Sequence, residues 1–202
     1  MRFIISILLA ILLLSCKQQS NKNRFWQQIS DYPKTIKDHF PKKLMGMYRT
    51  AVIEDNEHDV TSIMLLNQYG DSLYYRIKDS LLQIPHVTYN PMDTCLLVIN
   101  MYSNETNFFN SFKTKDKSYL KKECLKNKLP IPNFWAMDFK SNNITKLPND
   151  FNIYVFESKD EIINKEYLSK NVYMPDYWKH GYSKGVAMND KTHEIIYWFV
   201  LW

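Results

Sequence analysis

Apolar stretches separated by polar turns predict most of the strands in this chain. Residues 193–202 form the strongest stretch, because both alternating sets of side chains are apolar. Residues 94–102 show the same two-sided pattern. A strand with two apolar faces belongs in the interior of a sheet that is covered on both sides. The pattern therefore predicts two central, buried strands, at about 94–102 and 193–202.

Shorter apolar runs predict three further strands. They lie at residues 61–66, 152–156 and 184–188. The polar residues 189–192 separate the last of these runs from residues 193–202. Two strands joined by a short polar turn form a hairpin, so we expect one at the C-terminus.

Apolar residues at helical spacing predict helices between the strands. Leu73, Ile77 and Leu81 favour a helix after the Gly-Asp turn at residues 70–71, although the same stretch also suits a hairpin. Residues 117–127 carry an apolar stripe that is typical of a helix packed by one face. Weaker helical stretches are expected at residues 25–40, interrupted by Pro33, and from the capping box at residues 158–161 to about residue 169.

Together these elements predict an α+β fold. We expect a single layered domain over residues 25–202, in which helices pack on a mainly antiparallel sheet. A domain of this length can bury about 70% of the surface that its unfolded chain exposes, which is enough for a stable core. No internal repeat is visible in the sequence, and this argues against solenoid and propeller folds.

The N-terminus has the pattern of an export signal. Arg2 supplies a positive charge, and residues 3–14 are apolar apart from Ser6. A helix of twelve residues spans about 18 Å, whereas the hydrocarbon core of a bilayer is about 30 Å thick. The segment is therefore too short for a permanent membrane span, and its charge and length are those of a signal peptide.

The sequence Leu13-Leu14-Ser15-Cys16 follows, and it resembles the lipobox of bacterial lipoprotein precursors. The resemblance implies that residues 1–15 are removed and that Cys16, the first mature residue, carries a diacylglyceryl thioether. The alternatives are an ordinary signal peptide with a chance cysteine, or a signal anchor. By the resemblance, the polar residues 16–24 form a lipidated tether. The protein would then be held at the bacterial cell envelope by its lipid and face the periplasm or the exterior.

Two cysteines remain once Cys16 is assigned to the lipid. Cys95 and Cys124 form an even pair in a compartment that can oxidise them. Two outcomes stay open: a disulfide that closes a loop of about 30 residues, or two buried free thiols that pack as small apolar side chains.

Charge and composition exclude several classes of partner. The formal net charge is only +5, and an exported protein does not meet nucleic acid, so no nucleic-acid partner is expected. Seven lysines lie within residues 113–128. They could contact phospholipid headgroups or an acidic partner, but the solvent-exposed face of a helix is the simpler interpretation. With only 4 glycines, the chain has too few for a glycine-rich nucleotide-binding loop.

The sequence contains one segment that matches a catalytic motif and one acidic run that could bind a metal ion. The segment at residues 181–185 matches G-x-S-x-G, the nucleophile elbow of α/β-hydrolases, which places a strand before its serine and a helix after it. Here a hairpin follows, so we interpret the segment as a turn whose glycines lead into a strand. The acidic run at residues 54–59 lacks the spacing of a calcium loop, and the 5 histidines are scattered. We therefore expect no metal and no cofactor.

The densest group of aromatic and polar residues lies at residues 173–182. Its candidate interaction residues are Tyr177, Trp178, His180 and Tyr182. Such side chains suit a protein-binding hot spot or a platform for stacking sugars. A loop of this kind can equally fold back as a lid on the core.

Three functional hypotheses follow from these patterns. The first is a non-catalytic, lipid-anchored envelope protein that binds an unknown partner, such as another envelope protein. The second is an envelope hydrolase whose site is assembled by the fold around His180, Ser183 or the acidic residues. The third is a glycan-binding module. Because no motif assigns catalytic residues, the first hypothesis is preferred.

Overall fold

The computed structural model describes residues 24–55, 60–99, 121–163 and 174–202. The chain divides into two units, residues 1–35 and 36–202. In the first unit, residues 24–28 are helical, and the four-residue helix α2, Lys34–Lys37, crosses the boundary. Pro33 separates these two short helices, as the sequence predicts. None of the helices among the described residues has both the length and the apolar character needed to cross a membrane.

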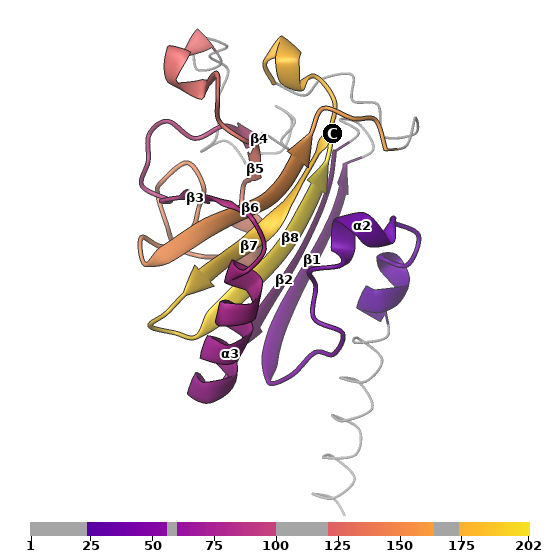
Figure 1. Cartoon of the computed structure of the whole chain (residues 1–202), viewed down its shortest axis with the longest axis vertical. Helices are drawn as coiled ribbons and strands as arrows, with labels where there is room; N and C mark the ends of the chain where they lie inside the picture. Colours follow the sequence, from indigo (N-terminus) through magenta and orange to yellow (C-terminus); the bar gives the residue numbers. More distant parts are fainter. Residues whose placement is uncertain (1–23, 56–59, 100–120, 164–173) are drawn as a thin grey trace, which may run out of the picture. The chain divides into compact units, whose positions relative to one another are not determined.

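The second unit is built on an antiparallel sheet of six strands (Figure 1). The strands lie in the order β1-β2-β8-β7-β6-β3. Their bounds are Met47–Asp55 for β1, Val60–Gln68 for β2, Val87–Tyr89 for β3, Phe151–Lys159 for β6, Tyr182–Asn189 for β7 and Glu194–Leu201 for β8. The other elements are the helix α3, Asp71–Leu82, and the 3-10 helices η3, Glu123–Leu125, η4, Trp135–Met137, and η6, Asp176–Trp178. The α+β fold and its mainly antiparallel sheet are thus as predicted.

Strand β8 is the centre of this sheet, as its two apolar faces predict. It pairs with β2 on one side and β7 on the other. Apart from its first residue, Glu194, the strand is buried along its whole length. Because both edges are hydrogen-bonded and both faces are covered, no part of β8 from Ile195 onward meets solvent.

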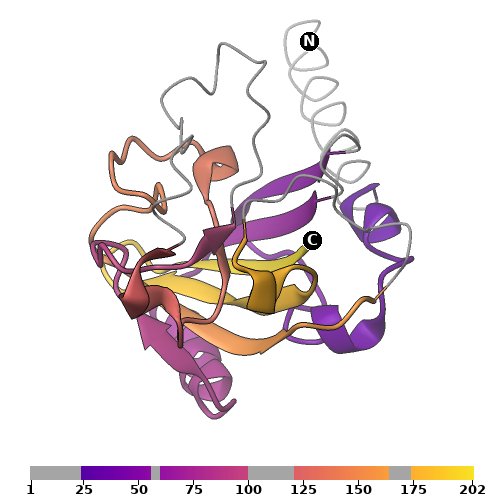
Figure 2. The same ribbon diagram turned by 90° about the horizontal axis from the view of Figure 1, so that it is seen from above.

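The two faces of the sheet are covered by different segments (Figure 2). One face carries Met64, Ile153 and Trp198, which join a large apolar cluster with residues from 95–99 and 125–147. The opposite face carries Tyr197 and Phe199. Phe40 packs on both of these rings, with centroid distances of 5.9 and 5.8 Å.

Helix α3 is fixed to the end of the β7–β8 hairpin on this second face. The Tyr74 hydroxyl donates to Asp190 Oδ1 at 2.6 Å, and Lys78 Nζ lies 2.7 Å from the same carboxylate. The helix that the spacing of Leu73, Ile77 and Leu81 predicts is confirmed, and the alternative of a hairpin in this stretch is wrong.

Two glycines, one within β7 and one just before it, face two tryptophans, one within β8 and one just after it. Gly185 pairs with Trp198, and a Cβ added to this glycine would lie only 2.8 Å from Trp198 Cζ2 and closer still to the Tyr154 carbonyl oxygen. Four residues earlier, Gly181 exchanges two backbone hydrogen bonds with Trp202, whose ring would lie 3.1 Å from an added Cβ. The two glycines are therefore the sites at which the large indole rings cross the neighbouring strand.

The predicted central strand at residues 94–102 is wrong. Only Val98–Ile99 forms a strand, β4, which pairs in parallel with β5, Ile131–Pro132, in a separate sheet. Residues 96–99 are all buried because they pack over the main sheet. A covering segment enclosed on all sides has the same apolar pattern as a central strand, so periodicity cannot separate the two. Residues 100–102 lie outside the described residues.

Two predicted helices are not formed where the structure describes them. Within the expected helix at 117–127, residues 121–127 contain only the 3-10 helix η3, and residues 117–120 lie outside the described part of the chain. At the expected capping box, β6 continues through Lys159, and the Ser158 hydroxyl lies 2.6 Å from the Ser183 hydroxyl instead of capping a helix. Residues 164–169 lie outside the described residues.

Cys95 and Cys124 are joined by a disulfide, with their Cα atoms 6.1 Å apart. The bond ties the segment before β4 to η3. Both segments belong to the layer that covers one face of the sheet, so the disulfide closes that layer on itself.

Substitution of Gly185 tests the fit between β7 and β8. We expect Gly185→Ala to lower the free energy of unfolding by about 1–3 kcal/mol, since the new methyl group forces the Tyr154 backbone or the Trp198 ring to move. The matched control is Gly70→Ser, because nothing lies within 4 Å of a Cβ at that position and serine, like glycine, is accepted at the N-cap of α3. Urea unfolding of both variants measures the effect, and equal midpoints would contradict this account of the packing.

Removal of the disulfide tests the covering layer. The cysteines are 29 residues apart, so loss of the bond should lower the free energy of unfolding by about 3–4 kcal/mol in the chain-entropy model. The double variant Cys95→Ser/Cys124→Ser and the reduced wild-type protein should lose similar amounts in denaturant titrations. An unchanged midpoint in either sample argues against a stabilising bond.

Candidate functional site

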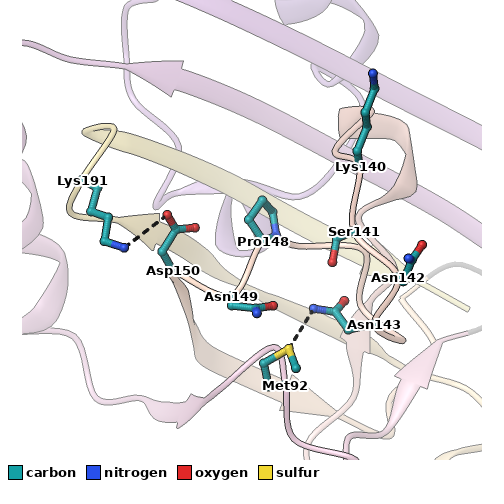
Figure 3. A pocket seen from close by; sticks show the side chains of 9 residues that line it. All are labelled: Met92, Lys140, Ser141, Asn142, Asn143, Pro148, Asn149, Asp150 and Lys191. Atoms are coloured by element: carbon teal, nitrogen blue, oxygen red, sulfur yellow. Dashed lines mark hydrogen bonds and ion pairs between the residues drawn. The ribbon is translucent and has the colours of Figure 1, made fainter.

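The second unit carries a hollow of about 870 Å³ on its surface (Figure 3). This volume lies in the range of about 300–1,000 Å³ that is typical of ligand pockets. Seven of its nine lining residues are polar or charged, and three of them are asparagines. We call it the asparagine hollow, and its lining residues are Met92, Lys140, Ser141, Asn142, Asn143, Pro148, Asn149, Asp150 and Lys191.

Three segments that are distant in sequence meet at the asparagine hollow. They are the loop after β3, which carries Met92, the loop at residues 140–150, and the turn of the β7–β8 hairpin, which carries Lys191 (Figure 3). Each is an irregular connection, and each is held by an asparagine side chain that bonds to nearby backbone.

In the loop after β3, Asn90 Oδ1 accepts a hydrogen bond from the Met92 backbone N–H at 2.8 Å. Asp93 Oδ1 accepts from the Cys95 N–H at the same distance, and Cys95 is in turn fixed by its disulfide. Such turns, in which a short polar side chain replaces a backbone partner, restrict a loop to one conformation.

In the loop at residues 140–150, Asn143 is the central residue. Its Nδ2 donates to the Leu147 carbonyl oxygen at 2.6 Å, and its Oδ1 accepts from the Thr145 hydroxyl at 2.9 Å. From outside the loop, the buried Asn133 donates to the Ile144 carbonyl oxygen at 3.1 Å. The loop is therefore closed on itself and tied to the covering layer of the sheet.

In the hairpin turn, Asn189 Oδ1 accepts from the backbone N–H groups of Lys191 and Thr192, at 2.9 and 3.3 Å. The next residue, Asp190, connects the turn to α3 through Tyr74 and Lys78. All three walls of the asparagine hollow are thus held by hydrogen bonds within the chain.

The side chains that remain for a ligand are distinct from those that hold the walls. Within the described part of the chain, Ser141, Asn142 and Asn149 make no side-chain hydrogen bond. Lys191 Nζ lies 3.9 Å from Asp150 Oδ2, a surface pair of little energetic weight, since the lysine side chain is 79% exposed. Lys140 extends away from the other labelled side chains (Figure 3).

The four candidate interaction residues of the segment at 173–182 differ in their exposure to solvent. Tyr177 is 46% exposed. Trp178 is half-buried, and its carbonyl oxygen accepts a hydrogen bond from Trp202 Nε1 at 2.8 Å, in the manner of a lid on the core. His180 is also half-buried. Tyr182 is buried, at the start of β7. These side chains do not line the asparagine hollow.

Ser183, the serine of the G-x-S-x-G segment, is a structural residue. It is fully buried on β7, and its hydroxyl lies 2.6 Å from both the Pro130 carbonyl oxygen and the Ser158 hydroxyl. Asp190 and His193 lie beyond the other end of β7, and Asp190 is about 23 Å from Ser183 along the extended strand. They bind α3 instead, with His193 Nδ1 3.0 Å from Asp71 Oδ1. The segment at residues 181–185 is therefore structural, as predicted, although Gly185 lies within β7 and not in the turn before it.

A second polar cluster lies on the sheet face that carries Tyr197 and Phe199. Lys184 Nζ lies 3.1 Å from Asp38 Oδ1 and 3.3 Å from Glu157 Oε2. Beside Asp38, the ring of His39 is buried, and its Nε2 lies 3.0 Å from the Trp198 carbonyl oxygen, which can only accept. His39 therefore donates from Nε2 and turns Nδ1 towards Asp38, 3.8 Å from its Oδ1.

The titration of this cluster follows from its surroundings. Burial lowers the pKa of His39 below its ordinary value of 6.5, because the charged ring would lose its hydration. A hydrogen bond from His39 Nδ1, which the ring can donate once it is protonated, and the Lys184 ammonium hold the pKa of Asp38 well below its usual range. His39 is thus neutral at pH 7 and Asp38 is ionised. The cluster anchors residues 38–40 on the sheet.

Among the described residues, no three metal-ligating side chains come together. Residues 56–59, most of the acidic run considered above, lie outside those described. Of the seven clustered lysines, Lys113, Lys115 and Lys117 also lie outside them. Lys126 pairs with Glu123 at 2.5 Å, and Lys128 with Asp93 at 3.4 Å.

The comparisons with known proteins find no relative of this chain: no family model, no curated protein and no solved structure matches it. Sequence reasoning also missed the asparagine hollow. Its residues have the composition of ordinary turns, and only the fold brings Met92 and Lys191 to the loop at 140–150.

The buried His39 should make stability depend on pH. In the unfolded chain the histidine takes up a proton below about pH 6.5, whereas in the folded chain it does so only at lower pH. Stability is therefore complete above pH 6.5 and is lost as the pH falls. Between pH 7.5 and 5.5 we expect the free energy of unfolding to drop by at most about 1.4 kcal/mol, the amount for a ring that stays neutral in the folded chain over this range.

The matched variants are His39→Gln, which should remove this drop, and His86→Gln at an exposed histidine, which should keep it. Denaturant titrations at the two pH values measure the slope. A drop of the same size in His39→Gln would assign it to another group.

Proposed function

We propose that this protein is a non-catalytic, ligand-binding lipoprotein of the bacterial cell envelope, anchored through Cys16. The observation that carries the binding role is the asparagine hollow, whose walls are fixed by internal hydrogen bonds while Ser141, Asn142 and Asn149 keep their side chains free. Signal, lipobox and tether lie in residues 1–24, of which the structure describes only the last.

The anchor is supported by the order of features along the chain. A positive residue, an apolar run and Leu13-Leu14-Ser15-Cys16 come first, and a polar stretch then separates Cys16 from the first helical residues at 24–28. Several acyl chains on one cysteine hold a protein at a membrane far more firmly than a single chain does. In this proposal, the sheet unit over residues 36–202 is the part that is carried outside the cytosol.

The binding role is supported by the chemistry of the asparagine hollow. Its free groups are amides and a hydroxyl, which hydrogen-bond but do not titrate near neutral pH. Its one carboxylate, Asp150, faces Lys191 at the rim. Proton transfer requires groups poised to gain and lose protons, whereas these groups recognise a ligand by its hydrogen-bonding pattern. The hydrolase alternative also loses its candidate nucleophile, since Ser183 bonds to the Pro130 carbonyl oxygen in the interior.

Lipid attachment is tested by expressing the full chain in a bacterium that is fed labelled palmitate. The wild-type protein should carry the label and fractionate with membranes. Cys16→Ala should lose the label completely and keep residues 1–15, because lipidation precedes cleavage at a lipobox. The labelled band is detected on gels, and the mass of the mature N-terminus is measured by mass spectrometry.

The control is Cys95→Ala/Cys124→Ala, which should keep both the label and the membrane fractionation. A wild-type protein with an unmodified Cys16, or label retained in Cys16→Ala, would overturn the anchor.

A further inference from the structure

We infer that the asparagine hollow binds a glycan, in the form of a short, neutral oligosaccharide. This inference rests on the proposed ligand-binding function and names the class of ligand. It is carried by four features of the hollow: the kinds of hydrogen-bonding groups that are free, the balance of charge, the apolar contacts, and the rigidity of the walls.

The free groups of the asparagine hollow are both donors and acceptors. Each amide of Asn142 and Asn149 offers two N–H donors and one oxygen acceptor, and the Ser141 hydroxyl can do either. A phosphate or carboxylate group on its own mainly accepts hydrogen bonds, and an ammonium group only donates them, so neither alone would pair with all of these groups. A row of sugar hydroxyls both donates and accepts at short intervals and can satisfy all of them.

The charges at the asparagine hollow favour a neutral ligand. Lys191 and Asp150 face each other across 3.9 Å and largely cancel. The third charged side chain, Lys140, extends away from the amides, as Figure 3 shows. A strongly charged ligand would therefore find no concentrated opposite charge among the lining residues.

Two apolar side chains complete the lining. Met92 is 52% exposed, and its sulfur is held 3.8 Å from Asn143 Nδ2. The ring of Pro148 lies between Asp150 and Ser141 in Figure 3. The C–H faces of sugar rings pack on apolar surfaces of this kind while their hydroxyls bond to polar neighbours. The asparagine hollow thus presents both kinds of contact that a pyranose ring offers.

The rigid walls reduce the cost of binding such a ligand. Sugars are strongly hydrated, so they gain little by leaving water, and a site that must also order its own loops would bind them poorly. Here the hydrogen bonds of Asn90, Asn143 and Asn189 already fix the three walls. Binding then needs to order only the few free side chains.

The test uses the full lipidated protein in micelles of an alkyl polyoxyethylene detergent, because this detergent has neither a sugar nor a phosphate headgroup. Maltotriose and triacetylchitotriose are the probes, observed by saturation-transfer difference NMR and titrated for the dissociation constant. We expect at least one of them to bind at millimolar or lower concentration. Asn142→Ala/Asn149→Ala should weaken that binding at least tenfold, and Ser141→Ala should weaken it to a smaller extent.

The matched control is Asn152→Ala, an exposed asparagine on β6 that does not line the hollow, and it should bind as the wild type does. Circular dichroism and thermal unfolding confirm that each variant is folded. Equal glycan binding by the wild type and the double variant would overturn the proposed site, and so would a lack of saturation transfer from both trioses at 10 mM, about the weakest binding that the assay detects.

A parallel titration with inorganic phosphate separates the two levels of the proposal. If phosphate binds, the double variant abolishes its binding and neither triose binds, then the glycan is overturned while the asparagine hollow remains a ligand site. If the wild type binds neither the trioses nor phosphate, both the glycan assignment and the binding role of the hollow are overturned, whereas the lipid anchor is decided by Cys16 alone.

Discussion

The close fit of two indole rings over two glycines is the constraint on which the rest of this structure depends. Trp198 crosses Gly185, and Trp202 crosses Gly181, because residues four apart on one strand meet residues four apart on its antiparallel neighbour. A shift of the register by one residue would place each ring on the wrong face of the sheet. The fit thereby fixes the register of β7 against β8, and this register sets the position of the hairpin turn that brings Lys191 to the asparagine hollow.

The parts of the fold that could be predicted are those in which local pattern and final environment agree. The two apolar faces of residues 193–202 predict β8, and the spacing from Leu73 to Leu81 predicts α3. The prediction of a central strand at 94–102 was wrong because the apolar pattern of this stretch comes from its burial over the main sheet and not from pairing within that sheet. The prediction of a helix from the capping box at 158–161 was wrong for a related reason. The hydroxyl of Ser158 has a partner on the next strand, Ser183, that is distant in sequence.

The asparagine hollow could not be predicted for a different reason. Asn142 and Asn149 belong to a stretch whose composition indicates only a loop, and nothing local connects them to Met92 or Lys191. The convergence arises from the sheet order, which places the start of β6 beside the end of β7. By contrast, the segment at 181–185 matches a catalytic motif, but its glycines are needed because the rings of Trp198 and Trp202 pack where a side chain would otherwise lie. Local composition therefore gave no sign of the asparagine hollow, and it indicated a catalytic motif at a segment that is structural.

Both faces of the sheet are used for packing, and this determines where a binding surface can lie. Phe40 and α3 cover one face, and the apolar cluster around Leu97, Phe134 and Trp198 covers the other. Lys184, a charged group within one of these layers, is committed to Asp38 and so helps to hold that layer on the sheet. Where strands end and loops begin, the described residues leave hydrogen-bonding groups without partners close to one another. The asparagine hollow lies at such a place, at the junction of the β7–β8 turn with the start of β6, and a rigid sheet can hold its three loops in fixed positions without contributing a catalytic group.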